Sequence, residues 1–159
     1  KCGFKNNKVT SYESIYGGAC NIEKSNFSMI DCIFENNYAR TDGKTFAEKE
    51  FAYGGAISFS NSNGKFFNCS FIQNKVNSSF LRAFGGAIRF DSSETSFVYC
   101  TFSNNFVIGP TEASGGIIFL KKTNASLDNC SILNNYIYSN AGDAYGGAIY
   151  SENGNLNIE

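Results

Sequence analysis

Cysteine is the residue whose spacing in this sequence first suggests chemistry. Thiols can form disulfides, ligate metals or act as nucleophiles, and the chain holds six cysteines and no histidine. Without histidine or a Cys-x-x-Cys pair, a metal site has little support. We predict a column of free thiols that pack as small apolar groups, and some disulfide pairing remains the alternative. The column consists of Cys2, Cys32, Cys69, Cys100 and Cys130.

Carboxylates are the other groups that could do chemistry here, because cleavage of a polysaccharide needs clustered acids or a base with calcium. The aspartates of this chain occupy scattered, non-equivalent positions of the repeat. They are Asp31, Asp42, Asp91, Asp128 and Asp143. We therefore predict a protein that is not an enzyme and has no catalytic residue, metal or cofactor.

Two short phrases recur along the chain and set its period. Gly-Gly-Ala-Ile, as in residues 54–57, alternates with Cys-x-Phe-x-x-Asn, as in residues 69–74. With a few apolar replacements, each phrase occurs five times at intervals of 30 to 37 residues, a period typical of solenoids and propellers. No Gly-Lys-Ser/Thr follows the glycines, so a phosphate loop is not supported. We predict a bend with positive φ and a backbone too crowded for a Cβ.

Apolar residues alternate within each phrase, and a period of two predicts short strands with one buried face. We expect about three strands per repeat. A propeller blade is longer than this repeat, and no tight hairpin turn joins the strands. The sequence favours an all-β, single-stranded parallel β-helix of about five coils, each about 30 residues long. One inward column is predicted at Met29, Phe66, Phe97, Leu127 and Leu156.

A second inward column consists of asparagines, one at the end of each Cys phrase. Stacked amides can hydrogen-bond the amide of the next coil and the local turn. We predict a structural ladder with no role in ligand binding. It comprises Asn7, Asn37, Asn74, Asn105 and Asn135.

Length and charge bound the remaining possibilities. A net charge of -1 gives no electrostatic footprint for nucleic acid, and no apolar run is long enough for a membrane span. The chain opens within one phrase and lacks a polar cap, which a solenoid needs. We expect residues 1–159 to be one β-helix segment that stacks on other coils of the same longer chain. Residues 40–53 are predicted to form a long loop insertion.

Aromatic residues gather in the variable spacers, where partner-specific side chains would be displayed. A stripe of Tyr16, Tyr53, Phe84 and Tyr145 precedes the glycine pairs and is broken by Ser114. These rings either shield the base of the loops or form a contact face for a protein or glycan. The predicted partner contacts are Phe46, Phe51, Tyr53, Phe84 and Tyr145.

Several Asn-x-Ser sequons would accept glycans in a secreting eukaryote. Asn77, in a spacer, and Asn124, in a turn, are the most accessible candidates, and Asn26 is a third.

The alternation of Gly-Gly-Ala-Ile with Phe-x-x-Asn resembles the repeats of the chlamydial polymorphic outer-membrane proteins and of other microbial surface proteins. It covers nearly the whole chain, with Cys20, Ile117 and Ile132 as apolar departures. The resemblance implies a right-handed parallel β-helix, displayed extracellularly or at the cell surface, with an adhesive or structural role.

Three functions are weighed on these grounds. The favoured one is a non-catalytic extracellular rod that acts as a surface adhesin or as a structural or filament component. The alternative is a β-helix protein that binds or cleaves a polysaccharide. Binding of ice or a mineral would need a regular outward column of threonine or aspartate, and the outward residues after the glycine pairs are unmatched.

Overall fold

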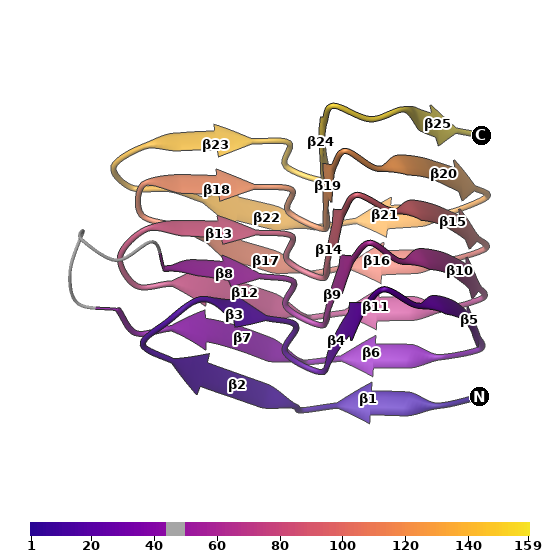
Figure 1. Ribbon diagram of the computed structural model, residues 1–159, viewed down its shortest axis with the longest axis horizontal. Coiled ribbons are helices and arrows are strands. Elements are labelled where there is room, and N and C mark those ends of the chain that lie inside the picture. The colour runs from indigo at the N-terminus through magenta and orange to yellow at the C-terminus, as the bar shows by residue number, and fades with distance from the viewer. Residues whose placement is uncertain (44–49) are drawn as a thin grey trace.

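The computed structural model describes residues 1–43 and 50–159, and through them the chain winds as a right-handed parallel β-solenoid (Figure 1). Every regular element is a strand, and no helix occurs among the described residues. Strands from successive coils pair in parallel and build five sheets of five strands. The predicted all-β parallel β-helix of about five coils is confirmed.

Each coil gives one strand to each sheet, and the sheets are named A to E in chain order. Sheet A holds β1 (Gly3–Lys5), β6 (Ile33–Glu35), β11 (Ser70–Ile72), β16 (Thr101–Ser103) and β21 (Ser131–Leu133). Sheet B holds β2 (Lys8–Ser11), β7 (Tyr38–Thr41), β12 (Lys75–Ser78), β17 (Phe106–Ile108) and β22 (Tyr136–Tyr138). Sheet C holds β3 (Ile15–Tyr16), β8 (Phe51–Tyr53), β13 (Arg82–Phe84), β18 (Glu112–Ser114) and β23 (Asp143–Tyr145).

The two remaining sheets follow the glycine pairs. Sheet D holds β4 (Cys20–Glu23), β9 (Ile57–Ser60), β14 (Ile88–Asp91), β19 (Ile118–Lys121) and β24 (Ile149–Glu152). Sheet E holds β5 (Asn26–Ile30), β10 (Asn63–Phe67), β15 (Glu94–Val98), β20 (Asn124–Asp128) and β25 (Leu156–Ile158). The predicted loop at 40–53 is shorter at both ends, because residues 40–41 belong to β7 and residues 51–53 form β8. Residues 44–49 of it lie outside the described part.

Five strands per coil replace the three that the sequence predicted, because single residues with positive φ bend the chain at its corners. The corner between sheets A and B uses Asn6, Asn36, Gln73, Asn104 and Asn134. The corner between sheets D and E uses Lys24, Asn61, Ser92, Lys122 and Asn153. The corner between sheets E and A uses Asp31, Asn68, Tyr99 and Asn129. These bends divide each coil into short strands, although the corner residues still donate their backbone N–H to the next coil, as Asn36 does to Ile72.

The glycine pairs make the fourth bend, between sheets C and D. The first glycine of each pair has positive φ, as Gly85 does at 69°. The second has no room for a side chain, because a Cβ on Gly86 would lie 2.3 Å from the carbonyl oxygen of Gly116 in the next coil. Both predicted reasons for glycine are confirmed, one at each position.

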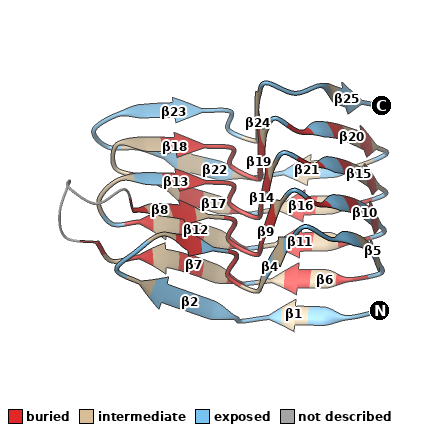
Figure 2. Ribbon diagram, in the orientation of Figure 1, coloured by how far each residue is buried: buried red, intermediate tan, exposed pale blue. Residues whose placement is uncertain are grey.

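The interior has two compartments (Figure 2). The larger one packs phenylalanines in stacked files, such as Phe34 on Phe71 at 4.9 Å between ring centroids and Phe71 on Phe102 at 5.1 Å. The smaller one lies between sheets B and C and consists mostly of alanine and valine, such as Ala83 and Val107, with Ile15 in the first coil. Large rings hold sheets A, D and E apart, whereas alanine lets sheets B and C approach closely.

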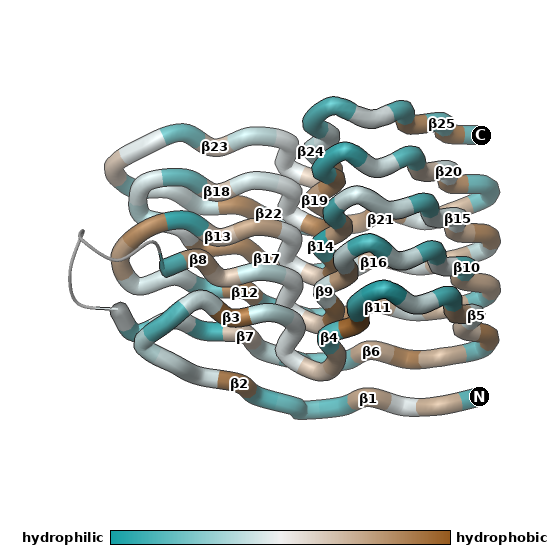
Figure 3. Tube along the Cα trace, viewed as in Figure 1, coloured by the Kyte–Doolittle hydropathy of each residue, from teal (hydrophilic) through white to brown (hydrophobic). Residues whose placement is uncertain are grey.

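Hydrophobic residues recur at the same place in successive coils, as the tube in Figure 3 shows for the bend after sheet E. The predicted inward column is right through Leu127 but wrong at its last member. Leu127 pairs with Ile158, whereas Leu156 pairs with Ala125. The final repeat has no cysteine from which to count, so the sequence assignment slipped by two residues.

Candidate ligand-binding groove

The five predicted asparagines form one continuous hydrogen-bonded file. The Nδ2 of Asn37 donates to Oδ1 of Asn74 at 2.9 Å, and Asn74 donates in the same way to Asn105 at 3.1 Å. Asn7 begins the file and Asn135 ends it. The backbone N–H of each asparagine also donates to the Oδ1 of the next, as Asn74 does to Asn105 at 3.0 Å.

A second bond of each Nδ2 fixes the file to the neighbouring coil. Asn74 donates to the carbonyl of Phe34 at 2.9 Å, and Asn105 to that of Phe71 at 2.9 Å. The three central asparagines, Asn37, Asn74 and Asn105, are fully buried. Their amides are therefore committed to the interior and have no capacity left for a ligand.

The cysteines are free thiols, and the five predicted ones lie at the bend between sheets E and A. The Cys69 thiol donates to the carbonyl of Phe67, two residues earlier, at 3.4 Å, and Cys100 does the same to Val98 at 3.5 Å. The Cys69 thiol and burial together raise the pKa of the Cys100 thiol above its usual range. Burial likewise raises the pKa of Cys32. Such thiols are poor nucleophiles.

A file of hydroxyl groups lies at the bend between sheets D and E, and the sequence analysis missed it. Ser62 donates to the carbonyl of Ser60 at 2.8 Å and accepts the N–H of Ser25 at 3.1 Å. Ser93 and Thr123 repeat both bonds in the next coils. The sequence did contain a signal for this file. Its hydroxyl residues, Ser62, Ser93 and Thr123, stand at one constant distance before Cys69, Cys100 and Cys130.

A concave corner lies on the outer surface, where sheets C and D meet. In β14, Ile88 and Phe90 are inward core residues, yet Arg89 between them is buried as well. Its cover comes from sheet C, since the Arg89 guanidinium lies over the Tyr53 ring at 4.6 Å from the centroid. In a sheet with one face open to solvent, outward positions such as that of Arg89 are exposed. The buried outward column therefore marks a groove.

Stacked aromatic rings form one wall of this groove. Tyr16 stacks on Tyr53 with 5.0 Å between centroids, and Tyr53 stacks on Phe84 at 5.3 Å. Phe51 meets both Tyr53 and Phe84 edge-on, at 6.0 and 6.2 Å. The structure thus brings together three of the predicted contact residues. A fourth, Phe46, lies outside the described residues.

The row of rings continues past Ser114, where the sequence analysis had it broken. Phe119, from sheet D, contacts Phe84 at 4.7 Å and replaces the missing ring of sheet C. Tyr150 then stacks on Phe119 at 5.6 Å and contacts the predicted Tyr145 at 5.5 Å. The outward residues of sheet D looked unmatched in the sequence because two different sheets supply the rings.

Arg89 is the central polar group of the groove. Its Nη2 donates to Asp91 Oδ2 at 2.6 Å, and its side chain is 9% exposed. The Nε of Arg89 is buried and has no hydrogen-bond partner. Burial raises the pKa of the neighbouring Tyr53 to about 12, so this phenol stays protonated at neutral pH.

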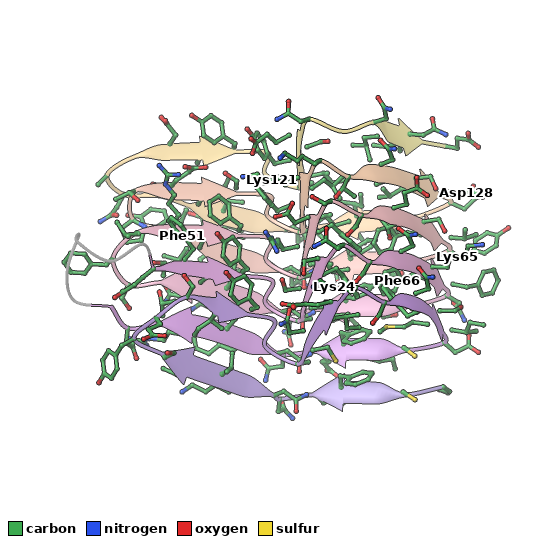
Figure 4. All side chains as sticks on the ribbon, in the orientation of Figure 1. Lys24, Phe51, Lys65, Phe66, Lys121 and Asp128 are labelled. Atoms are coloured by element: carbon green, nitrogen blue, oxygen red, sulfur yellow. The ribbon has the colours of Figure 1, made fainter. Side chains whose placement is uncertain are left out.

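A pocket of about 190 Å³ opens in the groove beside Arg89. Figure 4 labels Lys121, one of its lining residues, near the junction of sheets C and D. Arg82 pairs with Glu112 across neighbouring strands at 3.2 Å. The Arg89 pocket, as it is called below, is lined by Tyr53, Arg82, Phe84, Arg89, Glu112, Phe119, Lys121 and Glu152.

A second, wider trough of about 850 Å³ follows the outer face of sheet E. It is lined by polar side chains such as Asn63, Lys65 and Ser96, without an aromatic row. Two sequon asparagines, Asn26 and Asn124, are exposed there.

The third sequon asparagine lies elsewhere and is less accessible than the sequence suggested. Asn77 belongs to β12 rather than to a spacer loop, and it is half-buried. Its Nδ2 donates to the Tyr38 hydroxyl at 3.2 Å. Asn124 also begins a strand, β20, although its side chain is exposed. Asn26 and Asn124 are therefore better placed for glycosylation than Asn77.

Two features are absent from the described residues. Histidine, cysteine, aspartate and glutamate nowhere gather there in a group of three that could hold a metal ion. No helix in that part of the chain is long and apolar enough to cross a membrane.

No protein-family model, curated protein or solved structure matches the chain. The class of this protein is therefore defined by its own fold and surface, as a parallel β-solenoid with an aromatic groove.

Proposed function

We propose that this chain is a non-catalytic extracellular rod that acts as a surface adhesin. The ladders of asparagine, hydroxyl and thiol groups serve the interior, so the coils form a scaffold. The outer surface is left to carry binding residues. Display at the cell surface is part of this proposal and follows from the repeat resemblance. Further coils of the same longer chain would cover the open strand edges of the first and last coils.

The aromatic row is the observation that carries the proposal. Soluble proteins rarely leave aromatic groups contiguous on the surface unless a partner covers them. Tyr16 and Tyr145, at the two ends of the row, are 43% and 40% exposed. Tyrosine suits such a surface, because its ring is apolar and its hydroxyl is polar.

An adhesion assay tests the proposal. Beads carrying the chain are washed over cultured cells and over polysaccharide films, and the retained beads are counted. The double change Tyr53→Ala and Phe84→Ala should lower retention several-fold. Tyr136→Ala is the matched control, because Tyr136 stacks on Phe106 at 5.0 Å on the outer face of sheet B. Equal retention of all three proteins would contradict adhesion through this groove.

Polysaccharide cleavage is the second candidate, because two carboxylates, Glu112 and Glu152, line one pocket. Glu112 pairs with Arg82 and also accepts a hydrogen bond from Ser114 at 3.2 Å. These two contacts occupy both carboxylate oxygens of Glu112, so neither is free to act on a glycosidic oxygen as a general acid must. Release of reducing ends from a polysaccharide, lost in Glu112→Gln and Glu152→Gln, would favour cleavage over the rod.

A further inference from the structure

We propose that the Arg89 pocket binds one neutral sugar ring of a glycan. This inference rests on the proposed adhesive function and adds the chemical class of its ligand. Three properties of the pocket support it: an unpartnered donor, a set of aromatic rings and a balance of charge.

The unpartnered donor is the Nε of Arg89. A buried N–H without an acceptor is destabilising, and native proteins seldom retain one without a reason. Asp91 already holds the Nη2 of the same guanidinium and fixes its plane. A ligand oxygen in the pocket would satisfy the Nε. Hydroxyl and ring oxygens of a sugar are acceptors of this kind.

The rings supply the second property. Tyr53, Phe84 and Phe119 all line the pocket, and Phe84 and Phe119 are themselves largely buried. A pyranose has an apolar face of C–H groups and a polar rim of hydroxyls, so one ring can contact aromatic carbon and arginine together. The pocket, at about 190 Å³, is smaller than sites of roughly 300–1,000 Å³ for drug-sized molecules. It therefore accommodates a single ring.

Charge balance is the third property and selects a neutral ligand. Arg82, Arg89 and Lys121 supply three positive charges. Glu112 and Glu152 in the lining, with Asp91 paired to Arg89, supply three negative ones. The arginines already have carboxylate partners. Lys121 stands in register with Glu152 on the next strand. An acidic sugar would therefore add a negative charge to a site whose charges already sum to zero, and its desolvation would not be compensated.

NMR provides a direct test, because the chain has only three arginines, Arg40, Arg82 and Arg89, and each gives one Nε–H signal. The probes are methyl glycosides of glucose, galactose, mannose and N-acetylglucosamine, with galacturonate as the acidic comparison. We expect at least one neutral glycoside to shift the Arg89 Nε–H signal in a saturable way. Arg40 is the internal control, because it pairs with Asp42 on sheet B with the same spacing as Arg89 and Asp91.

Variants test where the sugar binds, and matched controls with a folding check accompany them. Arg89→Lys keeps the charge but loses the planar set of donors, and Phe84→Leu keeps apolar bulk but loses the ring. Each should weaken binding of the responding glycoside at least fivefold. Arg40→Lys and Tyr136→Leu should bind it like the parent. Preserved circular dichroism spectra show that a weakened variant is folded.

Each outcome separates the two proposals. A response to galacturonate alone would overturn the charge argument, and a glycan that binds equally to all variants would overturn the location. If no sugar shifts Arg89 but bead adhesion still needs Tyr53 and Phe84, the sugar assignment fails and adhesion through a protein partner stands. If adhesion is also independent of those rings, both proposals fail.

Discussion

At the residue scale, the side chain of each central asparagine in the file makes four hydrogen bonds, a set that requires a short amide. Asn74 accepts the N–H and Nδ2 of Asn37 and donates to Phe34 and Asn105. A short amide offers acceptor and donors on one planar group. That combination explains why the position holds asparagine in all five coils.

Asn74→Ala tests the cost of losing this group. Its neighbours would be left with buried, unpaired donors and acceptors, and each costs about 1–3 kcal/mol. We expect the free energy of unfolding to fall by about 2–5 kcal/mol, measured by urea denaturation. Asn140→Ala is the control, since Asn140 is exposed. A midpoint for Asn74→Ala close to that of the control would contradict the buried ladder.

Thiol reactivity gives a second prediction at this scale. The Cys69 thiol and burial raise the pKa of Cys100, so less of it is thiolate at a given pH and it reacts slowly. In the native protein at pH 8, a disulfide reagent should label the exposed Cys2 rapidly and the buried Cys32 and Cys100 slowly. In urea all six cysteines should react. Fewer than six without a reductant would show that some are paired as disulfides.

At the scale of elements, the bend between sheets C and D fixes the groove. The second glycine of each pair is required by the coil above it rather than by its own φ. This can be tested in the chain of residues 1–159, because no described coil stacks on its last glycine pair. A Cβ on Gly147 would meet nothing within 4 Å, whereas one on Gly86 would lie 2.3 Å from a carbonyl oxygen.

Gly86→Ala should therefore lower the free energy of unfolding by at least about 2 kcal/mol, as backbone must shift to admit the methyl group. Gly147→Ala should be neutral or stabilise by up to about 1 kcal/mol through the unfolded state. Thermal melts of the two variants beside the parent protein decide the matter. Equal losses from both changes would show that φ, rather than stacking, selects the glycine.

Periodicity was enough to predict the coils and the paired columns, because residues that repeat along the chain must stack. It was not enough to count the strands. Asparagine, as at Asn61, is a common residue at a corner with positive φ and so predicts a bend. Lys24, Ser92 and Tyr99 also occupy such corners. Lysine and tyrosine carry no turn signal, and serine carries only a weak one. Such residues are tolerated at a strained φ where a neighbouring coil fixes the backbone.

The groove was harder to predict than the core. Repetition draws attention to identical residues, and the stripe before the glycine pairs was found in that way. Arg89 and Phe119 occupy one position of sheet D yet differ in type. Their importance comes from the rings of sheet C that cover them, which depends on how two sheets meet at a corner. Sequence spacing alone contains no such information.

At the scale of the whole molecule, stability is shared between neighbouring coils. Deleting residues 85–114 removes one coil and brings Gly115 to the place of Gly85. We expect this protein to fold, with a strand-rich circular dichroism spectrum and a lower urea midpoint, because one coil interface is lost. Deleting residues 85–99 instead removes half a coil and offsets every column. A folded half-coil deletion, or an unfolded whole-coil deletion, would contradict stacking in register.

The asparagine file has a direction. From Asn7 to Asn105, one N–H of every Nδ2 donates to the Oδ1 of the asparagine in the next coil, and no such bond runs in the opposite direction. Aligned dipoles polarise one another, so the rod has a polar axis. Reversing one amide would set donor against donor at one side and acceptor against acceptor at the other. Any reversal must therefore involve the whole row, and an amide at one end of the protein constrains the orientation of the amide at the opposite end.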